Sequence, residues 1–497
     1  MPGRSLMIQG TGSHVGKSVL VSAICRIFAQ DGLRVAPFKA QNMANNAFVC
    51  RDGGEIGRAQ AVQALACGVE PTVEMNPVLL KPCTDTGSQV IVLGRVAKTM
   101  NAREYQAFKP SLIPTIKECL DRLLAQYDVV VIEGAGSPAE INLRESDIVN
   151  MRTAALADAP VVLVGNIDLG GVFAQLIGTL HLLRDDERAR VRAFIINKFR
   201  GDRDILKPGL EYLERETGRP VLGVLPYFKD IRIAEEDTVP AEKVGARAPD
   251  GKILIDVIKH PRIANFTDFD ALEAEPDVSL RYLERPDGRV PDALIFPGTK
   301  STIADLRSLR AAGFVDHAIR CAERGTTIVG VCGGFQMLGA RIFDPHHVES
   351  ESDVEEGLGL LPTITVFCEK KETSQVRALH VESGAEITGY EIHMGCTQGN
   401  PSPQPLFRIL ERFGMAADGY DGTSAREGRV WGTYLHGLFD SADFRRHFVN
   451  KLRRNRGLEP RETAARQDSL AELDKLAALV RKHLDIAYLY RILRREA

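Results

Sequence analysis

The sequence lacks paired cysteines, long hydrophobic runs and internal repeats. Its nine cysteines include no Cys-x-x-Cys pair and no cysteine–histidine cluster at the spacing of a structural zinc site. An odd number of scattered cysteines indicates reduced thiols. No apolar run approaches the ~20 residues that a membrane-spanning helix needs, and the first residues lead directly into a strand pattern. We therefore expect a cytoplasmic protein that does not bind a membrane.

A large charge of one sign is also missing. The 497 residues carry a formal net charge of -3, so the chain has no basic field that would attract nucleic acid. Apolar residues make up 44% and charged residues 26% of the chain, which is typical of a soluble globular protein. We expect its partners to be small molecules.

Two α/β series follow one another along the chain. Short apolar runs alternate with helical patterns, which predicts parallel sheets covered by helices, and the chain is too long for one ordinary core. We predict two doubly wound parallel-sheet domains, P-loop NTPase-like over 1–235 and glutaminase-like over 252–441, with a charged boundary at 230–251 and a helical tail over 442–497. The predicted strands are Leu6–Ile8, Arg34–Phe38, Val129–Ile132, Pro160–Val164, Ala193–Ile196, Val221–Leu225, Ile253–Ile258, Ala293–Phe296, Thr327–Val331 and Arg429–Leu435.

A glycine-rich loop follows the first predicted strand. It fits the pattern G-x-x-x-x-G-K-[ST] and opens an apolar helix, a context that favours a phosphate site over a plain glycine turn. Backbone N–H groups of such a loop surround phosphate oxygens, Lys17 can neutralise the β/γ-phosphates, and the Ser18 hydroxyl suits Mg²⁺. We predict that ATP and Mg²⁺ bind here. The predicted nucleotide-binding residues are Gly10, Thr11, Gly12, Ser13, His14, Val15, Gly16, Lys17 and Ser18.

Two charged residues end neighbouring strand patterns. Glu133 follows four β-branched residues, which favours a second magnesium ligand, although a surface or helix-capping carboxylate is the alternative. Lys39 is a candidate catalytic residue that stabilises charge on a transferring phosphoryl group. An exposed lysine at a strand end explains Lys39 almost equally well.

Two polar segments follow Lys39. Residues 41–46 (QNMANN) concentrate side-chain amides, and residues 51–58 (RDGGEIGR) mix both charges with glycines. Amide clusters suit recognition of a polar ligand, but asparagine also serves turn geometry. The spacing does not decide between these two interpretations.

The second half carries a thiol at a sharp turn. Residues 327–338 predict a strand, a turn with Cys332 at its apex, and a helix. Flanking glycines permit a strained turn, and a helix N-terminus favours the thiolate. A buried structural cysteine is the alternative, and it suits the other eight cysteines better. We predict that Cys332 is a nucleophile and that His436, at the end of a late strand pattern, is its base.

The two sites together predict a coupled reaction. Backbone N–H groups of Gly298 and Gly333 are candidates for an oxyanion hole beside Cys332. We expect Cys332 to attack the carboxamide of glutamine and release ammonia through a γ-glutamyl thioester. The phosphate loop would convert a carboxylate into an acyl phosphate, which ammonia displaces. A path shielded from solvent between the two sites is our hypothesis, because ammonia is protonated in bulk water.

Segments over nearly the whole chain resemble known families. The loop with Lys39 and Glu133 is similar to dethiobiotin synthetase, in which a P-loop enzyme activates a carboxylate as a mixed phosphoric anhydride. From the loop to about Phe439 the chain resembles the cobyric acid synthase family, the glutamine-dependent amidotransferases of cobalamin biosynthesis. This resemblance is carried by QNMANNAF, DGGEIGRAQA, MNPVLLKP, INLRESDIVNM, GNIDLGGVFA and NKFRGD in the first half, and by Phe296–Thr302, the Cys332 turn, GYEIHMG and His436 in the second.

The resemblance implies a substrate and further site residues. It implies four ATP-dependent amidations, of the b, d, e and g carboxylates of adenosylcobyrinic acid a,c-diamide. It also implies that Asn197 contacts adenine, that Asp52 is a further metal ligand, and that Glu55 lies near metal or substrate.

The corrinoid begins as a polyanion, so basic side chains are candidates for holding it. Arg58, Arg144 and Lys81 are such candidates. Each of them is equally well explained as a surface salt-bridge partner worth under ~1 kcal/mol.

One position departs from the usual class I glutamine amidotransferase pattern. A glutamate is expected two residues after His436, but the chain has Leu438. The cobyric acid synthase branch shares this absence. Without that carboxylate we expect His436 to be less firmly oriented and glutamine hydrolysis to be modest. Glu391 and His393 are either substitutes or contacts with the other domain.

Two alternative functions remain open from the sequence. The sister enzyme that makes the a,c-diamide shares both domain types, and the INLRESDIVNM and QNMANN segments favour the later step by resemblance. A nucleotide-switched binding protein of the partition-ATPase type with a degenerate glutaminase-like domain is the other alternative. The loop lacks the additional early lysine of that family, and both Cys332 and His436 are present. The sequence predicts neither the oligomeric state nor the role of the tail.

Overall fold

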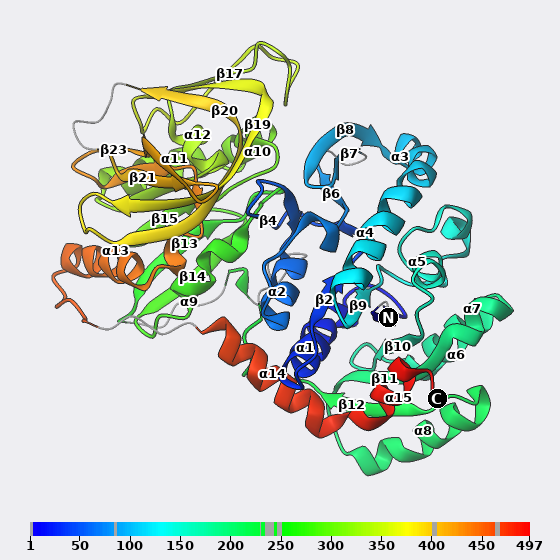
Figure 1. Cartoon of the computed structure of the whole chain (residues 1–497). Helices are drawn as coiled ribbons and strands as arrows, with labels where there is room; N and C mark the ends of the chain where they lie inside the picture. The colour runs from blue at the N-terminus through cyan, green and yellow to red at the C-terminus, as the bar shows by residue number, and fades with distance from the viewer. Residues whose placement is uncertain are drawn as a thin grey trace.

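The computed structural model forms two α/β units that lie side by side (Figure 1). No helix among the described residues is long and apolar enough to cross a bilayer. The structure describes residues 3–83, 87–228, 230–233, 243–245, 251–399, 405–462 and 468–497.

The first unit contains a six-stranded parallel sheet in the order β12-β11-β10-β1-β9-β2. Its central strands are continuous apolar runs that are buried on both faces, as expected of a parallel sheet covered by helices. All six strands predicted in this half are confirmed. Their bounds are β1 Arg4–Gly10, β2 Val35–Phe38, β9 Val129–Glu133, β10 Val161–Asn166, β11 Val191–Phe199 and β12 Val221–Pro226.

Helices cover both faces of this sheet. On one face α1 (Lys17–Gln30) packs in a core that includes β-branched residues of β9, β10 and β11. The other face packs against α4 and α6. The remaining helices of this unit are α3 Ala102–Phe108, α4 Ile113–Gln126, α5 Met151–Leu156, α6 Val172–Leu182, α7 Asp185–Arg190 and α8 Arg203–Thr217.

Between β2 and α3 the chain makes an excursion that the sequence did not predict. It forms a four-stranded sheet, β3-β6-β7-β8, and a separate hairpin of β4 and β5 that leads into α2. Figure 1 shows β4 beside the second unit. The bounds are β3 Gln41–Met43, β4 Ala47–Val49, β5 Glu55–Gly57, α2 Arg58–Cys67, β6 Val78–Pro82, β7 Gly87–Val92 and β8 Arg95–Asn101.

The second unit has its own six-stranded sheet in the order β14-β13-β15-β16-β24-β23. All of its strands are parallel except the edge strand β23. The four strands predicted for this half are confirmed. The bounds are β13 Ile253–Ile258, β14 Val278–Leu283, β15 Ala293–Phe296, β16 Thr327–Val331, β23 Thr423–Ala425 and β24 Val430–Thr433; the helices are α9 Asp270–Glu273, α10 Thr302–Ala311, α11 Phe314–Glu323 and α12 Gly333–Leu338.

A largely antiparallel sheet packs against this unit and was not predicted. In its long strand β19 buried residues alternate with more exposed ones at both ends, as in a sheet with one solvated face. In the other long strand, β20, three consecutive residues, Tyr390–Ile392, are buried. The acidic segment 349–356 contributes the short strand β18. The bounds are β17 Arg341–Phe343, β18 Val354–Glu356, β19 Thr363–His380, β20 Glu386–Gly399, β21 Phe407–Arg412, β22 Met415–Asp421 and β25 Leu435–His436.

The C-terminal helices are divided between the two units. Helix α13 (Ala442–Asn455) packs into the core of the second unit, whereas α14 (Ser469–His483) and α15 (Ile486–Arg494) return to the first and cover α1 and β1. Arg26 of α1 pairs with Asp474 of α14 at 2.6 Å. The last two helices of the tail therefore pack against the first unit. The predicted boundary at 230–251 lies mostly outside the described residues.

Candidate functional site

Two features define the shape of the glycine-rich loop: the left-handed backbone of Gly16 and the hydrogen bonds of Lys17. Gly16, at the N-terminus of α1, has φ of 95°, which favours glycine. The Lys17 ammonium donates to the carbonyl of Gly12 at 2.8 Å and to that of Gly136 at 3.1 Å. The loop thus joins the carboxyl ends of β1 and β9, where ligands of parallel sheets bind.

The side chain of Asn197 makes a hydrogen bond to the backbone of this loop. Its Nδ2 donates to the carbonyl of Val15 at 2.8 Å, and its Oδ1 accepts the N–H of Lys198 at 2.8 Å. A Cβ at Gly16 would lie 2.2 Å from Asn197 Nδ2, so the contact also requires glycine there. Nδ2 keeps a second N–H and Oδ1 a second lone pair, so the adenine contact that the resemblance implies stays a prediction.

Glu133 is the centre of a buried polar cluster. Its carboxylate accepts hydrogen bonds from Ser18 Oγ at 2.8 Å, Lys39 Nζ at 2.8 Å and Gln63 Nε2 at 2.5 Å. Burial opposes ionisation, but the charge and the hydrogen bonds of Lys39, with those of Gln63 and Ser18, lower the pKa of Glu133. The interpretation of Lys39 as an exposed lysine is wrong, because its side chain is only 8% exposed.

Ser18 and Glu133 fit a magnesium ion. Their hydroxyl and carboxylate oxygens are hard donors, and Mg²⁺ at a phosphate site needs only one or two carboxylates besides phosphate oxygens and water. The described parts of the chain contain no group of three or more His, Cys, Asp or Glu side chains that could hold a metal ion. The pair is thus suited to a metal that arrives with a nucleotide.

Asp52 and Glu55 lie away from this pair. Asp52 is exposed in the turn of the β4–β5 hairpin, where its Oδ1 accepts the N–H of Gly54 at 2.9 Å. Glu55 is buried between Lys81 and Lys371, which lower its pKa to about 2 against the effect of burial. Across the described residues no contact joins Asp52 or Glu55 to Glu133, and the metal role of Asp52 stays a prediction.

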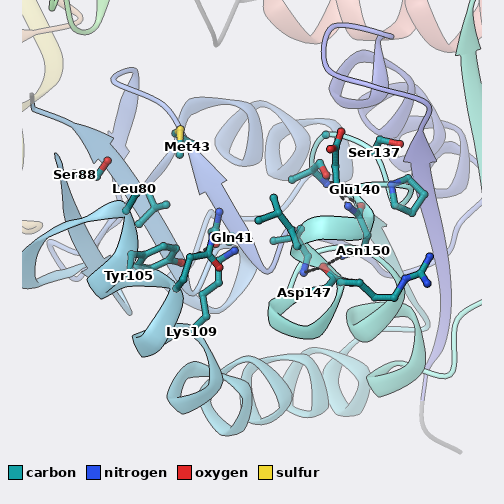
Figure 2. A pocket seen from close by; sticks show the side chains of 18 of the residues that line it. Gln41, Met43, Leu80, Ser88, Tyr105, Lys109, Ser137, Glu140, Asp147 and Asn150 are labelled. Atoms are coloured by element: carbon teal, nitrogen blue, oxygen red, sulfur yellow. Dashed lines mark hydrogen bonds between the residues drawn. The ribbon is translucent and has the colours of Figure 1, made fainter. Parts of the chain in front are cut away.

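An open cavity of about 540 Å³ lies beside the phosphate loop (Figure 2). It borders Gly136, which also accepts the bond from Lys17. In Figure 2, Gln41, Tyr105 and Lys109 lie on one side of it, and Asn150 lies on the other.

The basic candidates for a polyanion are distributed unequally around this cavity. Arg144 is among its lining residues, whereas Lys81 lines the smaller cavity at Cys332. Arg58 lies at the contact between the two units, with its guanidinium 5.8 Å from the centre of the Phe48 ring. Lys109, which the sequence reasoning missed, also lines the large cavity, and burial lowers its pKa.

Cys332 stands at a strained turn between β16 and α12. Its φ is 53°, an uncommon value for a residue other than glycine, and its Sγ lies 3.3 Å from the carbonyl oxygen of Ile392. The residue is 7% exposed, at a cavity of about 40 Å³. The predicted strand, turn and helix are confirmed.

Gly334 permits this turn to approach β15. A Cβ at this position would lie 1.9 Å from the carbonyl oxygen of Phe296. We therefore expect Gly334→Ala to lower the free energy of unfolding by about 2 to 4 kcal/mol, because backbone must move to relieve the clash. Gly419→Ala is the matched control, since a Cβ there would meet no atom within 4 Å. Equal midpoints of the two variants in urea unfolding would contradict this reading.

His436 is paired with a carboxylate that the sequence reasoning missed. Asp268 Oδ2 lies 2.6 Å from His436 Nδ1, and Asp268 Oδ1 accepts the N–H of Gly437 at 3.1 Å. Burial lowers the pKa of the imidazole, but Asp268 and then Cys332 outweigh it and raise the pKa to about 10. The expectation that His436 lacks an orienting carboxylate because of Leu438 is therefore wrong.

The two suspected substitutes serve other contacts. Glu391 accepts hydrogen bonds from Arg412 at 2.9 Å and Ser374 at 3.2 Å. The ring of His393 stacks on Tyr434, with 3.7 Å between the ring centres. Asp268 orients His436, which is the role that the sequence analysis considered for Glu391 and His393.

Gly298 and Gly333 lie beside the thiol, as predicted. A Cβ on Gly298 would lie 3.1 Å from His436 Cε1 and 3.7 Å from Cys332 Cβ. Gly333 is the first residue of α12, so its N–H belongs to the set that the helix leaves without an internal partner. The geometry joins a thiol, an imidazole with its carboxylate, and candidate donors for an oxyanion.

Each of the two units matches a known family of domains. Residues 6–241 match a family model described as the CobQ/CobB/MinD/ParA nucleotide binding domain, and residues 254–444 match one described as the CobB/CobQ-like glutamine amidotransferase domain. The chain is 50% identical over 497 residues to the cobyric acid synthase of Dehalococcoides mccartyi, covering 98% of each chain. It is also 50% identical over 499 residues to the cobyric acid synthase of Streptococcus sanguinis, covering 99% of each.

Proposed function

The chain belongs to the cobyric acid synthase family of glutamine amidotransferases, and we propose that it amidates the b, d, e and g carboxylates of adenosylcobyrinic acid a,c-diamide with ATP and glutamine. The observation that carries this proposal is the presence of a phosphate loop and a thiol–imidazole–carboxylate set in one chain. We further propose that 1–235 and 252–441 are the synthetase and glutaminase domains.

In the glutaminase domain, Cys332 attacks the carboxamide carbon of glutamine. The N–H groups of Gly298 and Gly333 hold the oxyanion, and the His436 imidazolium protonates the departing ammonia. Water then hydrolyses the γ-glutamyl thioester, which releases glutamate and restores the thiol. Asp268 holds the imidazole by Nδ1, 2.6 Å away, so that Nε2 faces the reaction.

In the synthetase domain, the phosphate loop and Lys17 hold the β- and γ-phosphates of ATP. Ser18 and Glu133 would hold Mg²⁺, which supplies charge neutralisation to the phosphate chain. Lys39, close to Glu133, stabilises the phosphoryl group as it passes to a corrinoid carboxylate. Ammonia attacks the resulting acyl phosphate, and inorganic phosphate leaves.

The cavity beside the phosphate loop suits one edge of the corrinoid. Apolar side chains such as Leu80 and Met100 can contact a macrocycle, while the amides of Gln41 and Asn150 can bond its side chains. Lys109 and Arg144 supply positive charge for carboxylates. Because Gly136 borders both the cavity and Lys17, a carboxylate in the cavity lies next to the phosphate loop.

Mass spectrometry of the corrinoid tests the proposal. The a,c-diamide is incubated with the protein, Mg–ATP and either glutamine or ammonium, and the number of carboxylates converted to amides is counted. We expect four stepwise conversions with both nitrogen sources in the wild type. Cys332→Ala should amidate with ammonium alone, and its matched control Cys321→Ala should use both. Absence of amidation with either source in the wild type would reject the proposal.

A further inference from the structure

The hairpin β4–β5 of the first unit makes hydrogen bonds to two side chains of the second unit that contact the imidazole of His436. The backbone N–H of Ala47 donates to Asn265 Oδ1 at 3.0 Å, and the backbone carbonyl of Ala47 accepts from the Tyr390 hydroxyl at 3.2 Å. Asn265 Nδ2 lies 3.3 Å from His436 Nε2, and the Tyr390 ring stacks on His436 with 5.1 Å between centres. One residue of the synthetase unit thus holds two side chains that contact His436.

A second contact fixes the loop that carries Asp268. Asn46 Oδ1 accepts the N–H of Phe266 at 3.1 Å. Phe266 lies two residues before Asp268, the hydrogen-bond partner of His436. Asn46 therefore serves the contact between the units, a role that neither interpretation of the segment 41–46 anticipated.

Helix α2 continues this hairpin to the nucleotide site. Ala47 pairs with Gly57, the residue before α2, and the Arg58 N–H donates to the Asn46 carbonyl at 3.2 Å. Five residues further along α2, Gln63 donates to Glu133 at 2.5 Å. At a rise of about 1.5 Å per residue, these two ends of the contact lie roughly 8 Å apart along the helix.

Two buried side-chain amides of α2 each have an atom without a hydrogen-bond partner in the described structure. Gln60 and Gln63 are fully buried, yet Gln60 Nε2 and Gln63 Oε1 have no hydrogen-bond partner within the described structure. Buried amides are normally paired, and a water on a metal bound at Ser18 and Glu133 can donate to an oxygen such as Gln63 Oε1. Ligand binding would then tighten α2 at the end that faces Glu133.

We propose that α2 and the β4–β5 hairpin couple the nucleotide site to the glutaminase site, with Gln63 as the sensor and Ala47 as the contact that positions His436 through Asn265 and Tyr390. This inference rests on the proposed function of the two sites. Mg–ATP binding orders α2, the hairpin holds Asn265 and Tyr390 more firmly, and His436 spends more time in its working position. Glutamine hydrolysis is thereby restricted to protein that is ready to use the ammonia.

The rate at which iodoacetamide alkylates Cys332, measured by peptide mass spectrometry without corrinoid, tests the coupling. Couplings between sites are typically about 5- to 150-fold, so we expect Mg–ATP to raise this rate at least about 5-fold in the wild type. Gln63→Leu and Tyr390→Phe should reduce the response to below about two-fold. Tyr390→Phe keeps the ring that stacks on His436 and loses only the hydroxyl bonded to Ala47.

Matched variants separate the coupling from general damage. Leu65→Gln changes the exposed side of α2, and Tyr420→Phe removes a hydroxyl from an exposed tyrosine; both should respond as the wild type does. Calorimetric titration with Mg–ATP establishes that each variant is loaded. A wild type that is loaded but does not respond, or a Tyr390→Phe variant with the full response, would overturn the proposal.

A reciprocal measurement uses no chemistry at Cys332. Linkage requires glutamine to change the affinity for Mg–ATP by the factor by which Mg–ATP changes the affinity for glutamine. We therefore expect glutamine to tighten Mg–ATP binding at least about 5-fold in Cys332→Ala, and not in Cys332→Ala combined with Tyr390→Phe. Since neither readout needs amidation, coupling without corrinoid amidation would reject the proposed function alone, and amidation without coupling would reject this inference alone.

Discussion

Replacing Asp268 with asparagine is expected to lower glutamine-dependent amidation roughly 10³- to 10⁴-fold, as loss of the acid does in comparable triads. An amide cannot stabilise the imidazolium and can impose the wrong tautomer on His436, 2.6 Å away. Amidation with ammonium should stay within about two-fold of the wild type, because the synthetase site is untouched. The paired rates with glutamine and ammonium measure both effects.

The same variant should change the pH dependence of Cys332. Against the effect of burial, Asp268 raises the pKa of His436 to about 10, so the wild-type imidazole stays protonated through neutral pH and favours the thiolate. In Asp268→Asn the pKa of His436 falls, and this support is lost. We expect the pH dependence of Cys332 alkylation to differ between the wild type and the variant, because His436 keeps its charge to a higher pH in the wild type.

Asp270→Asn is the control for this substitution. Asp270 lies in the same segment, but the structure records no hydrogen bond between its side chain and His436 within the described residues. We expect this control to retain the wild-type pH profile. Near-normal glutamine-dependent turnover in Asp268→Asn would show that His436 works without the carboxylate and would contradict the assignment.

Replacing Glu133 with glutamine is expected to lower amidation at least about 10³-fold with glutamine and with ammonium alike. The variant keeps the shape of a side chain that contacts Ser18, Lys39 and Gln63, but it removes the charge that a magnesium ion needs. Alkylation of Cys332 in the absence of nucleotide should continue, since the thiol lies in the other unit.

The control for Glu133 is Glu216→Gln, on the exposed surface of α8. It should amidate at the wild-type rate with both nitrogen sources. Thermal unfolding of both variants checks that each is folded. Ammonium-dependent amidation within ten-fold of the wild type in Glu133→Gln would remove Glu133 from the reaction.

The features that could be predicted from the sequence are those whose pattern lies within a short stretch of consecutive residues. The central strands are short apolar runs, and the turns at Gly16 and Cys332 each lie within about ten residues of a strand and a helix. Asp268 could not be found in this way, because it lies 168 residues before His436 and no pattern joins them. Only its position after β13, at the carboxyl edge of the second sheet, would have made it a candidate.

The missed and incorrect features have related physical causes. The strands β19 and β20 mix polar and apolar residues, and their longest apolar run is only Val366–Cys368. Asp52 accepts the N–H of Gly54 in the turn between β4 and β5, and its metal role, implied by resemblance, stays a prediction. The role of Asn46 depends on a partner more than 200 residues away, the backbone N–H of Phe266.

The most direct test of the central claim follows nitrogen from glutamine to the corrinoid. The protein is supplied with Mg–ATP, the a,c-diamide, glutamine labelled with ¹⁵N in its amide, and excess unlabelled ammonium at a pH at which free ammonia is scarce. We predict that all four new amides carry ¹⁵N in the wild type and that Cys332→Ala incorporates only the unlabelled nitrogen. Full exchange of the label with solvent ammonium in the wild type would contradict a shielded transfer between two sites of one chain.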